Sequence, residues 1–137
     1  KIALPRMYLF AALAYAGRRV PFDKKRMVST TRDTRVPSFL DIREPYFPIY
    51  PYAWDVDIQG AKNPVGRQAV VAVRPRFDYW GFTATIDIKE EIFSVEKTRR
   101  LFDLAGKMSG LGDFRPGKGG LYGCFRVAHW EVKNASD

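Results

Sequence analysis

A glycine-rich segment near the C-terminus carries residues suited to contact a phosphate. Residues 110–127 read GLGDFRPGKGGLYGCFRV, with six glycines and the cations Arg115, Lys118 and Arg126. Glycine admits positive φ and lets backbone amides approach a ligand closely, which suits an anion. The segment is neither a P-loop nor a dinucleotide fingerprint, because it lacks G-K-[ST] before a helix and no strand precedes its glycines. It predicts a phosphate-contacting loop, with a flexible connector as the alternative.

A second group of cations lies in residues 18–37, RRVPFDKKRMVSTTRDTRVP, which are polar and bounded by prolines. This pattern predicts a long loop or a β-ribbon. Arg and Lys neutralise phosphates, and aromatic rings interleaved with them stack on bases. The candidate nucleic-acid-binding residues are therefore Arg18, Arg19, Lys24, Lys25, Arg26, Arg32, Arg35, Phe114, Arg115, Gly117, Lys118, Gly119, Gly120, Tyr122 and Arg126.

The charge of the chain is concentrated at its two ends. The 137 residues carry a formal net charge of +8, of which 1–37 hold +7, 38–93 hold −2 and 94–137 hold +3. A field concentrated in this way attracts polyanions more strongly than the same charge spread evenly. A charge that serves only solubility is the alternative. Aromatic residues make up 15% of the chain, which excludes a largely disordered protein.

Other groups that could do chemistry are few. Asp55, Asp57 and Asp87 alternate with apolar residues, and neighbouring strands could bring them together as a metal pair for phosphoryl chemistry. Carboxylates on a solvated strand face are the alternative. His129 and Glu131 lie two residues apart and could act as an acid–base pair. A structural or surface histidine is the alternative. Cys124 is expected to be a small buried residue. One Cys and one His exclude the usual zinc sites, and we expect neither metal nor cofactor.

The elements that would position these residues alternate between helix and strand. Residues 5–17 predict a helix with an apolar stripe of Met7, Leu9, Phe10, Leu13 and Ala14. Three prolines predict an extended, non-central segment over 45–51. Period-two alternation predicts strands over 52–58 and 80–88. Residues 68–74 predict a further strand, which forms a hairpin with the first around a turn at 59–67. Core-facing positions in these strands are Tyr52, Trp54, Val56, Ile58, Phe82, Ala84, Ile86 and Ile88.

The C-terminal third predicts one more helix and one more strand. Ser94 is a good N-cap, and an apolar stripe from Val95 to Met108 predicts a helix that ends near Gly110. Residues 121–132 predict the last strand. The order indicates an α+β, ferredoxin-like or RRM-like split βαβ domain over 1–137, in which two helices cover one face of an antiparallel sheet. This plan requires a first strand that precedes or overlaps the N-terminus. Residues 18–51 would be a basic, proline-rich insertion, with an inserted hairpin after it.

The segment G-x-x-R-P-x-x-G-G-x-x-G-x-F-x-V, with the helix before it, resembles a small group of phage-encoded proteins. These are in turn similar to the RAMP superfamily of ferredoxin-like proteins, which build CRISPR effector backbones and bind or process CRISPR RNA. The resemblance covers about residues 80–132. The residues that carry it are Gly112, Phe114, Arg115, Pro116, Gly119, Gly120, Gly123, Phe125 and Val127. It implies that Arg115 and Lys118 lie along an RNA backbone, and the lack of a histidine near the first helix argues against cleavage.

These observations favour a non-catalytic protein that binds single-stranded nucleic acid, RNA more than DNA. The expected partners are single-stranded RNA or DNA, with a homo-oligomer or a larger ribonucleoprotein assembly left open. No apolar run approaches the roughly 20 residues of a membrane span, so we expect no membrane and a cytoplasmic location, the bacterial host cytoplasm if the chain is phage-encoded. The alternative is an assembly subunit that docks on an acidic partner through residues 45–52. A metal-dependent nuclease is a further alternative.

Overall fold

The computed structural model describes residues 2–50, 55–62, 69–76, 80–112, 115–120 and 122–133, and for 55–62 and 69–76 it describes the backbone. The chain divides into two units. Unit 1 comprises Lys1–Leu4 and Tyr46–Thr83, and unit 2 comprises Pro5–Pro45 and Ala84–Asp137. A single domain over 1–137 stays a prediction.

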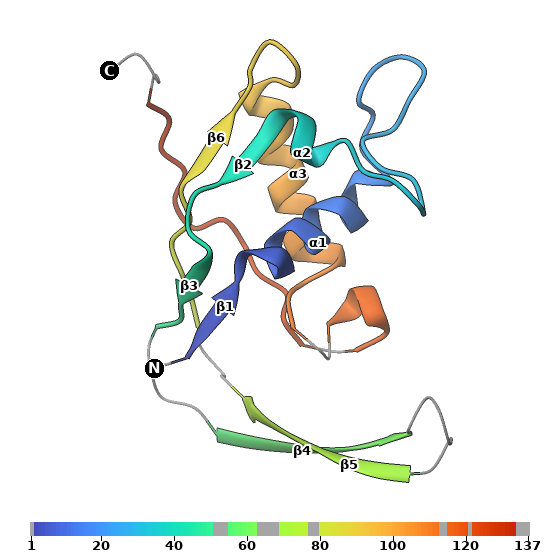
Figure 1. Cartoon of the computed structure of the whole chain (residues 1–137), viewed down its shortest axis with the longest axis vertical. Helices are drawn as coiled ribbons and strands as arrows, with labels where there is room; N and C mark the ends of the chain where they lie inside the picture. Colours follow the sequence, from blue (N-terminus) through green and yellow to red (C-terminus); the bar gives the residue numbers. More distant parts are fainter. Residues whose placement is uncertain are drawn as a thin grey trace. The chain divides into compact units, whose positions relative to one another are not determined.

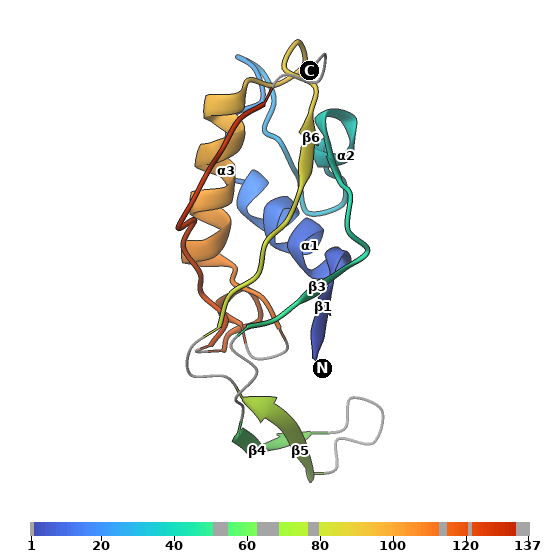
Figure 2. The ribbon, with the colours of Figure 1, turned by 90° about the vertical axis from the view of Figure 1, so that its left-hand side faces the viewer.

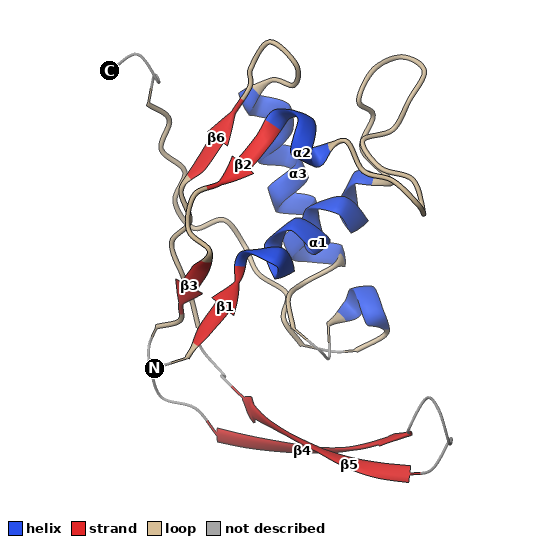
Figure 3. Cartoon of the chain, in the orientation of Figure 1, coloured by secondary structure: helices blue, strands red, loops and turns tan. Residues whose placement is uncertain are grey.

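The protein is of the mixed α+β class, as the sequence predicts (Figures 1 and 3). Its described strands form three two-stranded sheets, β1–β3, β2–β6 and β4–β5. The ferredoxin-like plan stays a prediction. In the part of the chain that the structure describes, no helix has the length and apolar character to cross a membrane. The elements are β1 (Ala3–Pro5), α1 (Arg6–Gly17), α2 (Val36–Phe39), β2 (Leu40–Ile42), β3 (Tyr46–Pro48), β4 (Asp55–Lys62), β5 (Ala69–Arg76), β6 (Ile86–Ile88), α3 (Val95–Met108) and the 3-10 turn η1 (Pro116–Lys118).

The predicted first helix is confirmed as α1, with Pro5 as its N-cap. The N–H of Arg6 finds a partner outside the helix in the carbonyl of Pro45, 3.0 Å away. The buried residues of α1 are Leu9, Ala12, Leu13, Ala16 and Gly17. Met7 is 71% exposed, so its predicted place in the apolar stripe is wrong. Apolar side chains occur on every side of α1, and its periodicity therefore could not indicate which side faces the core.

The second predicted helix is confirmed as α3, which packs against α1. Its N-cap is Ser94, whose Oγ accepts a 3.2 Å hydrogen bond from the N–H of Lys97. Its buried residues are Thr98, Leu101, Phe102, Ala105 and Gly106. The helix forms where expected because its start signal and its apolar stripe are both local features of the sequence.

In unit 2, α1 and α3 lie on the same side of the β2–β6 pair (Figure 2). This pair is antiparallel, with Leu40 opposite Ile88 and Ile42 opposite Ile86. Residues 80–88 were predicted as one strand, but only 86–88 are paired as β6. The predicted faces are confirmed at 82–88, since the even-numbered residues are half-buried and the odd-numbered ones are exposed.

The predicted last strand over 121–132 is wrong within the described residues 122–133, which belong to no sheet. This segment packs on α3 instead. The N–H of Phe125 donates a 3.1 Å hydrogen bond to the carbonyl of Gly106, and the Trp130 ring meets the Phe102 ring at 5.6 Å. Cys124 is exposed, so the expected buried cysteine is also wrong. Exposure alternates along 122–127 as it would in a strand, but the partner is a helix.

Unit 1 contains the predicted hairpin as the antiparallel pair β4–β5. Its strands are longer than expected, because 59–62, predicted as turn, continue β4 to Lys62. The expected side-chain orientations at 52–58 lie outside what the structure describes. The proline-rich segment is extended as expected at β3, whose buried Phe47 stacks on Phe82 at 4.7 Å.

Candidate nucleic-acid interface

Residues 18–35, which we call the basic loop, are folded into two successive tight turns. Antiparallel bridges join Pro21 to Met27 and Ser29 to Thr34. The chain was predicted to be loop or ribbon as far as residue 37, but α2 begins at Val36. Val28 ties the two turns together, because its N–H donates to the carbonyl of Val20 and its carbonyl accepts from Arg35. The basic loop is therefore a folded feature with a buried residue at its centre.

Side-chain oxygens hold the tips of both turns. Oδ1 of Asp23 accepts from the N–H groups of Lys25 and Arg26 at 2.9 and 2.8 Å. Oγ1 of Thr30 accepts from those of Arg32 and Asp33 at 3.2 and 3.1 Å. Such bonds are typical of Asx and ST turns, in which a short polar side chain fixes the backbone. The cations at the tips are consequently presented by ordered backbone.

Arg26 is paired within the loop. Its Nη2 lies 2.7 Å and its Nε 3.0 Å from Oδ2 of Asp23. The hydrogen bond from Arg26, followed by that from the N–H of Lys25, lowers the pKa of Asp23 from 3.8 to about 2. An arginine that shares its charge with a carboxylate contributes less to an attractive field. Arg26 therefore stabilises the first turn more than it extends the interface.

An aromatic cluster fastens the basic loop to the core of unit 2. The Phe22 ring stacks on Phe93 at 5.8 Å with an interplanar angle of 7°, and Phe39 lies 4.5 Å from Phe93. The guanidinium groups of Arg26 and Arg35 lie 5.6 and 5.5 Å from the centre of the Phe22 ring. Cation–π contacts of this kind hold both guanidinium groups against the Phe22 ring. The role of Arg35 as an anchor was not apparent from the sequence.

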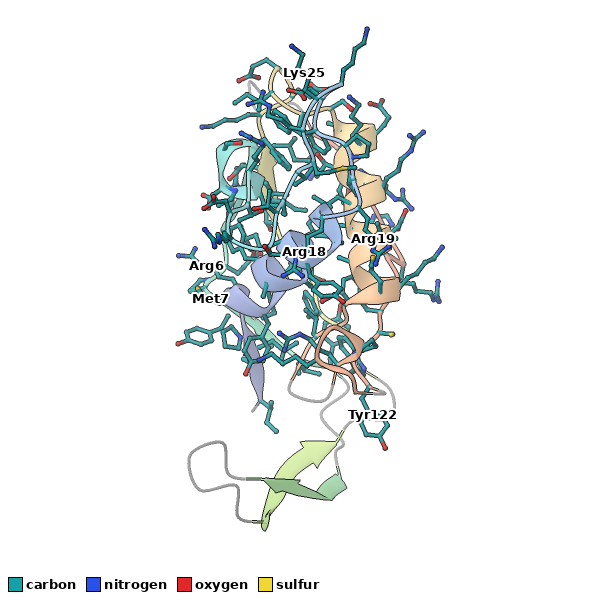
Figure 4. All side chains as sticks on the ribbon, turned by 90° about the vertical axis from the view of Figure 1, so that its right-hand side faces the viewer. Arg6, Met7, Arg18, Arg19, Lys25 and Tyr122 are labelled. Atoms are coloured by element: carbon teal, nitrogen blue, oxygen red, sulfur yellow. The ribbon has the colours of Figure 1, made fainter. Side chains whose placement is uncertain are left out.

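The remaining cations of the basic loop are exposed. Arg19, Lys24, Lys25 and Arg32 form no ion pair with any described residue, and Arg18 lies 5.0 Å over the ring of Tyr15. Figure 4 shows Arg18 beside α1, Arg19 next to it and Lys25 at the far end of the loop. These five side chains are the exposed cations of the loop that have no carboxylate partner among the described residues.

The glycine-rich segment uses its own backbone amides. The N–H groups of Gly117, Lys118, Gly119 and Gly120 all donate to carbonyls of residues 109–116, at 2.8–3.0 Å. These amides are not free to cradle a phosphate, which was the expected use of Gly117, Gly119 and Gly120. The Lys118 side chain is exposed, whereas Nη1 of Arg115 donates to the carbonyl of Gly112 at 2.8 Å. Phe114 lies outside the described residues.

Close backbone contacts explain several of the glycines better than ligand binding does. A Cβ on Gly106 would lie 2.1 Å from the carbonyl oxygen of Phe125, and one on Gly123 would lie 1.9 Å from that of Leu111. Gly123 also has a φ of +91°. These positions let the chain after η1 cross the end of α3 at backbone distance. Gly106, inside α3, is part of the same crossing, and no sequence motif marks it.

The last predicted contacts, Tyr122 and Arg126, follow that crossing and are both exposed. Arg126 has no ion pair among the described residues. The basic loop and η1 lie toward opposite ends of unit 2, with α1 between them (Figures 1 and 2). The two predicted groups of cations are therefore separate, and a single ligand would have to pass α1 to reach both.

The alternative chemistry has little support from the described residues. Asp87 is bound by Arg43 at 2.7 and 2.9 Å, and this hydrogen bond lowers the pKa of Asp87. β4, which holds Asp55 and Asp57, pairs with β5 rather than with β6. Where side chains are described, no three of the His, Cys, Asp and Glu residues gather as a metal site. His129 and Glu131 form a 3.7 Å surface pair, 82% and 62% exposed.

Comparison of the chain with protein-family models, curated proteins and solved structures finds no match. Inference about its function therefore depends on its own residues and their geometry.

Proposed function

We propose that this protein binds single-stranded nucleic acid, RNA in preference to DNA, and does not act on it chemically. The observation that carries the proposal is that two segments of unit 2, the basic loop and the residues near the C-terminus, each present exposed cations that lack an acidic partner among the described residues. In the basic loop these are Arg19, Lys24, Lys25 and Arg32, and near the C-terminus they are Lys118 and Arg126. Cations that are not neutralised within the protein are the groups that release counterions from a phosphate backbone.

The proposal includes a RAMP-like, ferredoxin-like plan. The order of α1, β2, β6 and α3, with both helices on one side of the β2–β6 pair, supports it. On this plan the chain would act in the cytoplasm, that of a bacterial host if it is phage-encoded, alone or in a larger ribonucleoprotein assembly.

Nucleic-acid binding is tested by measuring affinity for labelled single-stranded RNA across a salt series. The variant Lys24→Gln/Lys25→Gln/Arg32→Gln removes three exposed cations from the turn tips. Each lost phosphate contact lowers the slope of log K against log salt by about 0.7 for a single strand, so the slope should fall by about 2. Unchanged affinity and slope would show that the basic loop is not part of the interface.

A matched control has the same change in net charge at other exposed sites. Lys89→Gln/Arg100→Gln/Lys107→Gln removes three cations of unit 2 that have no ion pair among the described residues and are not in the proposed interface. This control should retain most of the affinity and the salt slope of the wild type. Equal losses in both variants would indicate a response to net charge alone.

A second candidate function is an assembly subunit that docks on an acidic protein. One observation favours it: along β3 and the two residues after it, the exposed Tyr46, Pro48 and Tyr50 alternate with the buried Phe47 and Ile49. Exposed tyrosines are enriched at protein interfaces. Light scattering and a pull-down, with Tyr46→Ala/Tyr50→Ala as control, test this function. A wild type that binds no RNA at low salt would favour this function over nucleic-acid binding.

A further inference from the structure

One face of α1 is exposed although the helix is apolar. Met7 and Tyr8 are 71% and 39% exposed, Ala11 is exposed, and Tyr15 is half-buried. At 100° per residue these positions and Arg18 fall within a sector of about 100°. The buried residues Leu9, Ala12, Leu13 and Ala16 occupy the other side of the helix. We call this set of residues, Met7, Tyr8, Ala11, Tyr15 and Arg18, the tyrosine face.

The tyrosine face is cationic as well as aromatic. The helix contains no acidic residue, and Arg18 and Arg19 follow its last turn. The Arg18 guanidinium lies 5.0 Å from the centre of the Tyr15 ring, so the two planar groups form one platform. Guanidinium planes and aromatic rings are the groups on which unpaired bases stack. Tyr8 and Tyr15 are about 10 Å apart along the helix axis, which leaves room for separate bases.

The position of the tyrosine face adds to its chemistry. It lies on α1, between the basic loop, which carries Arg19, Lys24, Lys25 and Arg32, and η1, which carries Lys118. Figure 4 shows Arg18 over α1, with Lys25 at one end of this side of unit 2 and Tyr122 at the other. A phosphate backbone that contacts cations at both ends would pass directly over α1.

We propose that the tyrosine face is a base-stacking site, on which Tyr8 and the Tyr15–Arg18 platform each take an unpaired base of single-stranded nucleic acid. This inference rests on the proposed function and adds to it the reason for preferring a single strand. A duplex keeps its base faces inside the stack and presents only phosphates here. An acidic peptide would be attracted by Arg18 and Arg19 but would not require the tyrosine rings.

The test compares wild type and Tyr8→Leu in binding a labelled single-stranded RNA and the duplex of the same sequence, over a salt series. Leucine is apolar and forms helix at least as well as tyrosine, so the fold is retained, as circular dichroism can verify. A lost stacking contact should weaken single-strand binding at least about five-fold. The salt slope and duplex affinity should not change, because no phosphate contact is removed. Tyr15→Leu should behave in the same way.

Two further variants serve as controls. Tyr8→Phe keeps the ring and should bind as the wild type does, and Tyr46→Leu removes an exposed tyrosine of β3 and should have no effect. If the wild type binds RNA with a steep salt dependence but Tyr8→Leu and Tyr15→Leu bind equally well, the stacking site is overturned and the proposed function stands. If the wild type binds neither strand nor duplex at low salt, both are overturned. If Tyr8→Leu instead abolishes capture of an acidic protein, the face belongs to a protein interface.

Discussion

The backbone N–H of Phe125 donates a 3.1 Å hydrogen bond to the carbonyl of Gly106, inside helix α3. The two segments also meet backbone to backbone at this point, because a Cβ on Gly106 would lie 2.1 Å from the carbonyl oxygen of Phe125. The C-terminal segment is thus joined to α3 by backbone contact, and Trp130 extends the contact to Phe102 and Arg99. In this way the glycines near the C-terminus determine where Arg126 is presented.

Gly106→Ala should destabilise the protein although alanine is the better helix former. The new methyl group meets backbone, which cannot rotate away, and overpacking of this kind costs about 1–3 kcal/mol. The gain in helix propensity, about 1 kcal/mol, offsets only part of that cost. Chemical denaturation measures the change. Gly119→Ala is the comparison, since its Cβ would meet nothing and only its φ of +79° is unfavourable.

Ser94→Ala should lower the free energy of unfolding by about 1 kcal/mol, because the N–H of Lys97 loses its acceptor at the start of α3. Ser94→Asp retains an acceptor and adds a negative charge at the positive end of the helix, so it should be as stable as the wild type. Urea unfolding followed by circular dichroism distinguishes the two. Equal loss in both variants would contradict the capping role.

The features that the sequence predicted best are those that depend on neighbouring residues. Ser94 and the stripe after it are sufficient to predict α3, and the alternation at 82–88 indicates correctly which residues face inward. The last strand was wrong for the opposite reason. A segment that packs on a sheet and one that packs on a helix can show the same alternation of exposure that residues 122–127 show. Which of the two forms here depends on the close contact with Gly106, which is distant in sequence.

The candidate site also combines features that the sequence shows with features that depend on the fold. Composition identified the cations of the basic loop, but it could not separate Lys24 and Lys25 at a turn tip from Arg35 over the Phe22 ring. That distinction depends on Phe39 and Phe93, which form the cluster only after the chain has folded. The sequence does not indicate the tyrosine face, because apolar residues occur on every side of α1. Its pattern therefore does not show that Tyr8 is exposed and Tyr15 half-buried.

Asp23 should titrate far below an ordinary aspartate. Its pKa of about 2 in the folded protein lies below the ordinary value of 3.8, so the stabilising contribution is complete above about pH 4 and is lost as the pH falls toward 2. Carbon-13 NMR of the carboxyl group measures this pKa. Arg26→Gln removes the largest cause and should raise it toward 3.8, whereas Lys24→Gln should leave it near 2. An unchanged value in Arg26→Gln would show that the backbone N–H groups alone hold the carboxylate.

Lys118 and Arg115 should differ in their effects although they are three residues apart. Nη1 of Arg115 donates to the carbonyl of Gly112, so Arg115→Gln should mainly reduce stability, by about 1 kcal/mol. The exposed Lys118 side chain has no ion pair among the described residues, so Lys118→Gln should leave stability unchanged and lower the salt slope of RNA binding by about 0.7. The same fall is expected for Arg126→Gln. If the double variant Lys118→Gln/Arg126→Gln binds RNA with the wild-type slope, the glycine-rich segment is structural and the interface is confined to the basic loop and α1.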